Sequence, residues 1–302
     1  MSLSPTSSAA IPQYLDKQRL QVDAELERIL PGAGEYPPSI HQAMRHSVFA
    51  GGKRLRPILC LESGRLFNGD ERSLRRLGCA LELIHTYSLI HDDLPALDND
   101  DLRRGKPSCH RVFGEATAIL AGDALLTLAF EIISEPGAGI EERRLEVIHD
   151  LSHAIGTRAG MVGGQVVDLE TAGHTTSAET LDYIHSAKTG SFIRAAVRSG
   201  ALDAGANPED LGRLSAYGGR IGLAFQIADD LLDVTSTREE LGKSVGKDDQ
   251  QHKATYPAIH GIEESRRIAV QLVHEACQAL EPYGDRARRL QELAHFLIER
   301  TH

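Results

Sequence analysis

Residues 91–100 read HDDLPALDND, and residues 225–233 read FQIADDLLD. Both segments place clustered aspartates in apolar, helix-like surroundings. Carboxylates a few ångströms apart raise each other's pKa and are costly to remove from water unless cations share the site. Mg²⁺ suits such oxygen ligands, because it binds through one or two carboxylates, several waters and substrate phosphates. Either motif alone is also typical of a solvated acidic face. Together, with their apolar flanks, they predict a Mg²⁺–phosphate site built from two facing helices.

The spacing of the aspartates indicates which of them can share an ion. Each residue of an α-helix advances by about 100°, so Asp229 and Asp233 lie about 40° apart and face the same side. Asp92 and Asp98 are separated by about 240° on a straight helix and would not converge. Pro95 removes a backbone hydrogen bond and its ring crowds the carbonyl four residues earlier. We therefore expect the helix to kink or end there and to bring Asp98 back toward Asp92.

Basic residues accompany both acid motifs. They occur in GGKRLRP (51–57), in RRGK (103–106), in KTG (188–190), which interrupts a helical pattern, and in a Gly- and Lys-rich segment at 238–257. The arginine guanidinium can bind phosphate through two parallel hydrogen bonds, whereas lysine acts as a mobile point charge. Each group alone fits a solvated surface. Beside two acid motifs, they predict two diphosphate sites, one bridged by metal and one held by cations alone.

The composition argues against several classes of protein. The chain has 302 residues, of which 41% are hydrophobic, and a net charge of −10. A nucleic-acid-binding protein would carry a basic surface instead. The four cysteines are scattered without a CxxC pair, which favours reduced thiols over disulfides or a zinc site. No apolar run approaches the roughly 18–20 residues of a membrane span, and the N-terminus lacks the features of a secretion signal. We therefore expect a cytoplasmic protein.

Helical periodicity recurs from residue 13 onward, and strand alternation is nearly absent. We expect one all-α domain over residues 13–302, preceded by a disordered tail at 1–12. The expected helices cover residues 13–30, 38–50, 55–67, 71–94, 115–134, 141–170, 177–199, 208–235, 264–282 and 284–300. Loops as long as the segment at 238–257 are often lids or binding loops. The alternative is a mobile surface connector.

Taken together, these motifs resemble those of the trans-isoprenyl diphosphate synthases, most of all the bacterial farnesyl diphosphate synthase branch. The blocks that carry the resemblance, in order, are GGKRLRP, LIHTYSLIHDDLPALDNDDLRRGKPSCH, FGEATAILAGDALL, GGQVVDL, AKTG, FQIADDLLD, LGKSVGKD and KATYP. They extend from about residue 40 to residue 260. The resemblance implies a single-domain helical bundle around a deep central cavity, and a homodimer. It also implies a prenyltransferase that condenses isopentenyl diphosphate with dimethylallyl or geranyl diphosphate.

The resemblance also implies metal ligands among the matching aspartates. Asp92 and Asp98 would ligate two of three Mg²⁺ ions that bind with the allylic diphosphate, and Asp229 would ligate the third. Asp93, Asp230 and Asp233 would contact the ions through water or support the ligands from behind.

Substrate-binding and catalytic roles follow from the same resemblance. Arg103, Lys188 and Lys243 would bind the allylic diphosphate, with Lys253 nearby. Isopentenyl diphosphate would bind without metal, in a set made of Gly52, Lys53, Arg56, His85 and Arg104. The carbonyl groups of Lys188 and Thr189, the Thr189 hydroxyl and the Gln226 amide would stabilise the allylic carbocation that forms when diphosphate leaves.

Product length can be predicted from the helix that precedes Asp92. At 1.5 Å per residue, Ser88 lies about 6 Å and Tyr87 about 7.5 Å below that aspartate. A tyrosine there can close the floor of the cavity, while the small Ser88 leaves room for a short tail. An aromatic residue five positions before the first aspartate is also similar to the bacterial farnesyl type, so we expect a C15 product.

Three alternatives remain open from sequence. A geranylgeranyl diphosphate synthase would differ only in product length. A class I terpene cyclase shares the first acid motif, but its second motif is usually of Asn/Ser/Glu type and its cavity is rich in aromatic residues; here aromatic residues are 5% of the chain and tryptophan is absent. A non-catalytic partner subunit would have lost part of the acid or lysine set, and this chain retains both.

Overall fold

The computed structural model describes residues 10–135, 140–235 and 255–298. The chain divides into two compact units. Unit 1 contains Met1–Leu61 and Glu71–Glu141, and unit 2 contains Glu62–Asp70 and Glu142–His302. In the residues described, both units are helical apart from one short hairpin in unit 1. The all-α prediction is therefore confirmed, whereas the extent of a single domain stays a prediction.

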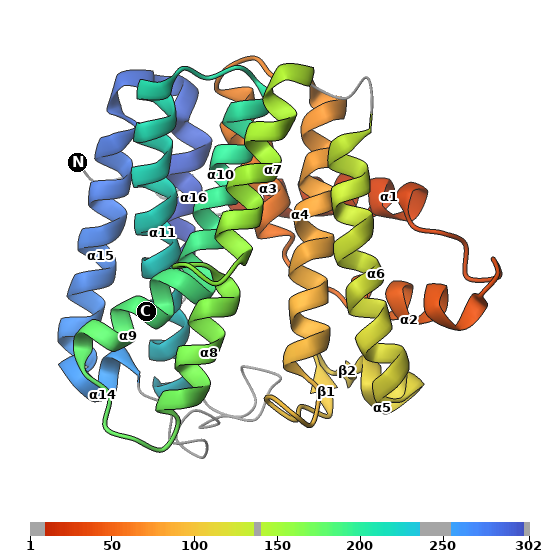
Figure 1. Cartoon of the computed structure of the whole chain (residues 1–302). Helices are drawn as coiled ribbons and strands as arrows, with labels where there is room; N and C mark the ends of the chain where they lie inside the picture. The colour runs from red at the N-terminus through yellow and green to blue at the C-terminus, as the bar shows by residue number, and fades with distance from the viewer. Residues whose placement is uncertain (1–9, 136–139, 236–254, 299–302) are drawn as a thin grey trace. The chain divides into compact units, whose positions relative to one another are not determined.

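Unit 1 is arranged around α4 (Glu71–Asp92) and α6 (Glu115–Ser134), which lie side by side (Figure 1). Apolar residues recur along α4 at three- and four-residue spacing, and Leu74, Leu77, Leu81 and Ile84 are all buried. α1 and α2 pack against α4, and α5 packs against α6. The other elements of this unit are α1 (Ala10–Ile29), α2 (Pro38–Val48), the first part of α3 (Leu55–Arg65), β1 (Leu102–Arg103), β2 (Lys106–Pro107) and α5 (Cys109–Phe113).

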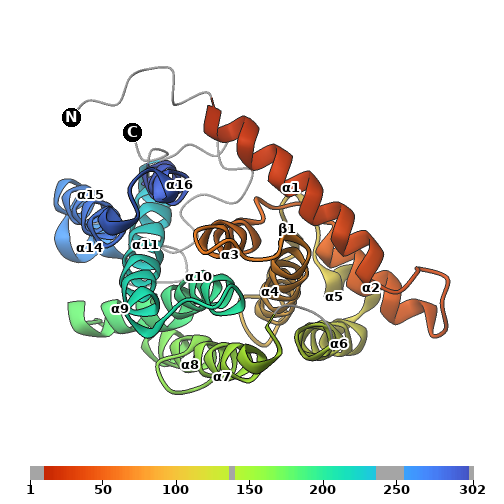
Figure 2. The ribbon, with the colours of Figure 1, turned by 90° about the horizontal axis from the view of Figure 1, so that it is seen from above.

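Unit 2 is built on α11 (Pro208–Thr235). Figure 2 shows α11 with α10 on one side and with α15 and α16 on the other. The buried stripe of α11 includes Leu214, Tyr217, Ile221 and Ala224, again at the spacing of one helical face. The further elements are η1 (Glu141–Arg143) at the unit boundary, α7 (Arg144–Ile155), α8 (Met161–Thr171), α9 (Ala178–Ile184), η2 (His185–Gly190), α10 (Ser191–Asp203), α14 (Tyr256–His260), α15 (Ile262–Ala279), η3 (Glu281–Ala287) and α16 (Arg288–Ile298).

Several helix boundaries differ from the predicted ones. α1 begins at Ala10, inside the predicted tail. The helix predicted at 141–170 is split into α7 and α8 by a turn, where a Cβ on Gly160 would lie 2.5 Å from the carbonyl oxygen of His153. The helix predicted at 177–199 is interrupted by the π-helical turn η2. The break between α7 and α8 was not predicted, whereas η2 contains the interruption that the sequence placed at KTG (188–190).

One described helix, α6, is long and apolar enough to cross a membrane by length and composition alone. This differs from the expectation that no segment reaches that length. The same composition is found in core helices of water-soluble proteins, and α6 packs on α4, α2 and α5. Its buried residues include Ala118, Ala121 and Leu125. The apolar character of α6 therefore fits a helix that packs within unit 1.

Candidate active site

The turn that follows α4 brings the two ends of the first acid motif together. α4 ends at Asp92, and the backbone N–H of Asp98 donates a hydrogen bond to the Asp92 carbonyl at 2.8 Å. The expectation that the helix ends near Pro95 and returns Asp98 toward Asp92 is thus confirmed. The side chains of Asp92 and Asp98 are both partly exposed, so the two carboxylates lie at the rim of unit 1 and not in its core.

Asp93, the next aspartate of the motif, is directed inward and is only 2% exposed. Arg103 Nε donates to Asp93 Oδ1 at 3.0 Å, and its Nη2 atom lies 3.4 Å from Asp100 Oδ2. Burial raises the pKa of Asp93, while the ion pair with Arg103 opposes that rise. The structure therefore joins two residues that the sequence assigned to different roles, one to metal and one to diphosphate.

A hairpin that was not predicted presents Arg103 and Arg104. β1 and β2 pair in antiparallel register, with Arg103 opposite Lys106. The turn between them contains Arg104 and Gly105, both in the left-handed region, with φ values of +54° and +76°. Arg104 then donates a hydrogen bond to the carbonyl of Gly51, which belongs to the GGKRLRP segment. The hairpin thus ties the second basic segment to the first.

The predicted isopentenyl diphosphate residues gather within unit 1. Gly52 has a φ of +128°, which favours glycine, and a Cβ on it would lie 2.4 Å from the end of the Arg104 side chain, so Arg104 passes close to this backbone. Burial, followed by the positive charges of Arg56 and Arg104, holds the pKa of His85 well below its ordinary value. Lys53 is exposed on the same segment. We call Arg56, His85 and Arg104 the cation cluster.

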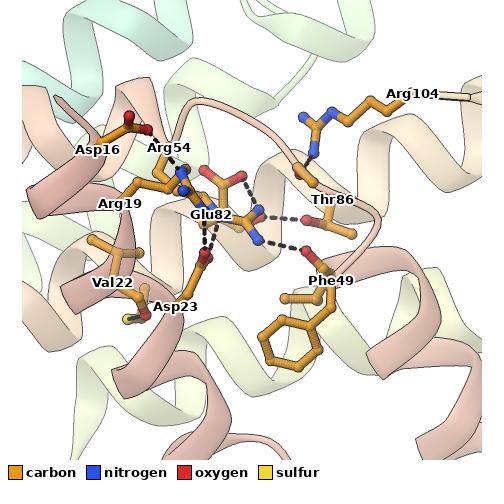
Figure 3. Close-up of polar contacts among 12 residues, drawn as sticks. Asp16, Arg19, Val22, Asp23, Phe49, Arg54, Glu82, Thr86 and Arg104 are labelled. Carbon is orange, nitrogen blue, oxygen red and sulfur yellow. Dashed lines mark hydrogen bonds and ion pairs between the residues drawn. The ribbon is translucent and has the colours of Figure 1, made fainter. Parts of the chain in front are cut away.

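Arg54 lies in the middle of the same basic segment but points into unit 1, as Figure 3 shows. It is 2% exposed and has a φ of +53°. Its guanidinium donates to Asp23 on α1 at 2.7 Å, to Glu82 on α4 at 2.8 Å and to the carbonyl of Val48 at 2.7 Å. This network holds the segment that carries Lys53 and Arg56 against α1 and α4.

The residues predicted to set product length lie on α4. Tyr87 is buried, and its ring meets that of His91 edge to face, with centroids 5.5 Å apart and an interplanar angle of 88°. The Nε2 atom of His91 in turn lies 3.1 Å from the carbonyl oxygen of Ile119 on α6. Ser88 Oγ donates to the His85 carbonyl at 2.9 Å. His91 therefore contacts both the Tyr87 ring and α6, while Ser88 makes a local contact to its own helix.

In unit 2, the predicted break at KTG is the π-helical turn η2. Lys188 Nζ donates to Asp168 Oδ2 on α8 at 2.7 Å. The turn packs closely against α8, because a Cβ on Gly164 would lie 2.4 Å from the backbone nitrogen of Lys188. Thr189 lies in the same turn and Gln226 lies on α11, both partly exposed. π-helical turns occur frequently at functional sites.

The second acid motif divides into exposed and buried members. Asp229 is exposed and Asp233 is partly exposed, whereas Asp230 is 6% exposed. Asp230 Oδ2 accepts hydrogen bonds from His185 Nε2 and from the backbone N–H of Tyr256, each at 2.9 Å. Sequence reasoning did not identify His185 or Tyr256. The predicted diphosphate ligands Lys243 and Lys253, and most of the predicted lid, lie outside the described residues.

The acid motifs are suited to Mg²⁺ by their chemistry. In residues 10–135, 140–235 and 255–298, no group of three or more His, Cys, Asp or Glu side chains is arranged to hold a metal ion. The candidate donors are Asp92 and Asp98, at the two ends of the turn in unit 1, and a second pair, Asp229 and Asp233, one helical turn apart on α11 in unit 2. Mg²⁺ requires no more than such a pair from protein, since it keeps waters and takes substrate phosphates as further ligands.

Comparison with known proteins identifies the family. The polyprenyl synthetase family model matches residues 37–290. A dimethylallyltranstransferase from Fischerella ambigua is 52% identical over 294 residues, which are 97% of this chain and 84% of that protein. A geranylgeranyl diphosphate synthase from Cyanophora paradoxa is 47% identical over 290 residues, 95% of this chain and 96% of that protein. The crystal structure of an FPP/GFPP synthase from Zymomonas mobilis superposes with a TM-score of 0.86 at 38% identity, covering 96% of this chain and 99% of that one. A match of this extent means that the chain belongs to the polyprenyl synthetase family, as a prenyltransferase of the short-chain isoprenyl diphosphate synthase type.

Proposed function

We propose that the protein condenses isopentenyl diphosphate head to tail with dimethylallyl or geranyl diphosphate and releases mainly farnesyl diphosphate. The observation that carries this proposal is the composition of unit 1. An acid turn bears Asp92 and Asp98, and a separate cation cluster forms where Arg104 contacts the basic segment at the Gly51 carbonyl. The acid turn suits a diphosphate bound through metal, and the cation cluster suits one bound without metal. Two diphosphates bound in these two ways match the two substrates.

Each group of residues has a part in the proposed reaction. Three Mg²⁺ ions would bind together with the substrate. They would stabilise the negative charge of the departing diphosphate. Asp92 and Asp98 would hold Mg²⁺ in unit 1, and Asp229 would hold it in unit 2, with Asp233 acting through water. Arg103 and Lys188 bind the allylic diphosphate oxygens, and Asp93 fixes the guanidinium of Arg103 for that contact. Lys243 and Lys253 complete this set in the proposal.

Carbon–carbon bond formation follows ionisation. The allylic C1–O bond breaks, and its electron pair leaves with the diphosphate. The π electrons of isopentenyl diphosphate then form the new bond to C1, and the resulting cation loses a proton to the departed diphosphate. The Thr189 hydroxyl, the carbonyls of η2 and the Gln226 amide stabilise the allylic cation by their dipoles. The cation cluster, with Lys53 and Gly52, orients isopentenyl diphosphate.

The chain length of the product is the most specific claim of the proposal. Tyr87 supports a C15 product, because it is buried five residues before Asp92 and its ring is held against His91. A geranylgeranyl product is the second candidate, since the Cyanophora paradoxa relative at 47% identity is a geranylgeranyl diphosphate synthase. The two candidates share every other residue assignment.

Incubation of the purified protein with Mg²⁺, isopentenyl diphosphate and each allylic starter tests the proposal directly. Products are dephosphorylated and separated by chain length. We expect C15 as the main product from both dimethylallyl and geranyl diphosphate. A main product of C20 would replace the farnesyl assignment by the geranylgeranyl one. Absence of condensation with every starter would contradict the enzymatic proposal as a whole.

Replacing Tyr87 with alanine is expected to lengthen the products. Removal of the phenol ring opens space below Asp92, so C20 and longer products should replace C15 as the major species. Product chain length measures the change, with Tyr183→Ala as the control, because Tyr183 lies on α9, is 38% exposed and has no proposed role. An unchanged C15 product from Tyr87→Ala would show that another residue closes the floor.

The remaining parts of the proposal concern assembly and location. We propose a homodimer in the cytoplasm with no stable membrane association. Sedimentation velocity at micromolar concentration measures the oligomeric state, and fractionation of expressing cells measures the location and any membrane association. A monomer that turns over at the full rate would contradict the dimer.

A further inference from the structure

Asp230 joins three elements of unit 2 through one oxygen atom. Its Oδ2 accepts from His185 Nε2 at 2.9 Å and from the Tyr256 backbone N–H at 2.9 Å. His185 is the first residue of η2, Asp230 lies on α11 and Tyr256 is the first residue of α14. All three residues are buried, with exposed fractions of 7%, 6% and 3%. A buried carboxylate that bridges two donors is a strong constraint on both of them.

Ring contacts reinforce this arrangement. The His185 and Tyr256 rings stack with centroids 5.4 Å apart and an interplanar angle of 24°. The Tyr256 hydroxyl donates a hydrogen bond to Asp182, the residue that lies three positions before His185. Burial, followed by that hydrogen bond, raises the pKa of the Tyr256 phenol, so the phenol stays protonated and keeps donating. Tyr256 is therefore bound at its backbone, its ring and its hydroxyl.

The opposite end of η2 is fixed to α11 as well. A Cβ on Gly222 would lie 2.7 Å from the Cα of Gly190, so the last residue of η2 approaches α11 more closely than any side chain would permit. Gly222 and Asp230 are eight residues apart on α11, about 12 Å along its axis. The π-helical turn is thus attached to α11 at both ends. Lys188 and Thr189 lie between the two attachments.

We propose that His185 and Asp230 are positioning residues for prenyl transfer, which hold η2 and α14 in fixed register with α11. In this arrangement Lys188 and Thr189 keep a constant relation to Asp229, the neighbour of Asp230 on α11. The inference rests on the roles proposed above for Lys188, Thr189 and Asp229. It assigns Asp230 to the protein scaffold and leaves the exposed Asp229 as the member of the pair that faces metal.

The first test separates positioning from metal binding. Asn at position 230 keeps the shape and an accepting oxygen for both donors, whereas a metal ligand requires the charge. We therefore expect Asp230→Asn to lower kcat by less than about tenfold and Asp229→Asn to lower it by more than about a hundredfold. Equal losses in the two variants would overturn the assignment, because Asp230 would then behave as a ligand.

The second test removes the His185 hydrogen bond while keeping its ring. His185→Phe can still stack on Tyr256 but cannot donate to Asp230, and His185→Gln restores a donor near the Nε2 position. We expect Phe to lower kcat by about 30- to 100-fold, as misplacement of catalytic groups by about 1 Å does. Gln should recover most of that loss. The KM for isopentenyl diphosphate, whose proposed ligands lie in unit 1, should stay within about twofold.

A matched control distinguishes positioning from loss of stability. Tyr217→Phe removes a buried hydrogen bond from the same helix, the 2.6 Å bond between the Tyr217 hydroxyl and the Leu290 carbonyl. We expect both Phe variants to lower the melting temperature and only His185→Phe to lower kcat. If His185→Phe retains kcat, or if both variants lose kcat in proportion to stability, the positioning role is excluded.

Hydrogen exchange of the ligand-free protein provides a readout that does not depend on turnover. His185→Phe should increase exchange in residues 185–190 and 256–260, and Tyr217→Phe should not. Unchanged exchange in these segments overturns the inference even if the enzyme is active. If the wild-type protein showed no prenyl transfer, the proposed function would be contradicted. Hydrogen exchange would still decide whether Asp230 fixes residues 185–190 and 256–260.

Discussion

Asp229→Ala is expected to lower turnover by about a thousandfold and to leave the fold intact. Loss of one preorganised group that stabilises developing charge costs about 10²- to 10³-fold in kcat, and this residue is proposed to hold an ion at the departing diphosphate. Asp229 is exposed on α11, so its removal leaves no cavity in the core of unit 2. Asp92→Ala should behave in the same way, because Asp92 is partly exposed at the end of α4.

Initial rates at saturating allylic and isopentenyl diphosphate, measured across a range of Mg²⁺ concentrations, test this prediction. Both variants should also need more Mg²⁺ to reach half of their residual rate. Thermal unfolding should match that of the wild-type protein. Asp285→Ala is a suitable control, because Asp285 is an exposed aspartate of unit 2 outside the motif. A variant that retains activity would remove its residue from the proposed metal ligands.

Arg54→Met is expected to destabilise the protein by about 3–5 kcal/mol. Glu82, one of its partners, is 2% exposed and lies 2.8 Å from the Arg54 guanidinium. Without arginine, this buried carboxylate loses a charged partner, and the Val48 carbonyl loses a donor. Lysine is a poor substitute for Arg54. Its single ammonium group cannot replace the three guanidinium nitrogens that bond to Asp23, Glu82 and the Val48 carbonyl. Urea unfolding of the ligand-free protein measures the loss.

Two further variants make the Arg54 prediction specific. Arg111→Met breaks the pair of Arg111 with Asp101 at 3.2 Å, in which both side chains are more than half exposed. That exposed pair should contribute no more than about 1 kcal/mol. The double variant Arg54→Met/Glu82→Met should recover part of the stability lost by Arg54→Met, because it removes the buried charge as well. A loss below about 1 kcal/mol for Arg54→Met would show that the network does not stabilise unit 1.

The first acid motif could be predicted in detail because its geometry is local. Pro95 excludes a continuous helix, and a six-residue separation then requires a turn if Asp92 and Asp98 are to meet. The backbone bond from Asp98 to Asp92 agrees with that reasoning. Local backbone chemistry, and not remote packing, decides this part of the fold.

Partnerships between distant residues were beyond sequence reasoning. GGKRLRP shows three cations but does not indicate which of them points inward, so Arg54 was given no role. Glu82, an acid surrounded by Leu81, Leu83 and Ile84, was the available signal, since a carboxylate on a buried helix needs a partner. No comparable signal marked His185, because its bond to Asp230 spans 45 residues. Contacts of this kind become visible only when the helices are packed.

The close glycine contacts of η2 have a consequence for protein engineering. Gly→Ala substitution in a helix commonly raises stability by about 0.4–1 kcal/mol, because alanine restricts the unfolded chain. At Gly164 and Gly222 the added methyl group would meet backbone atoms at 2.4 and 2.7 Å, so the usual gain would become a loss. Gly212 and Gly219 on α11 have nothing within 4 Å of the same position. A thermostable form of this enzyme is therefore better sought at those two glycines, away from the turn that carries Lys188.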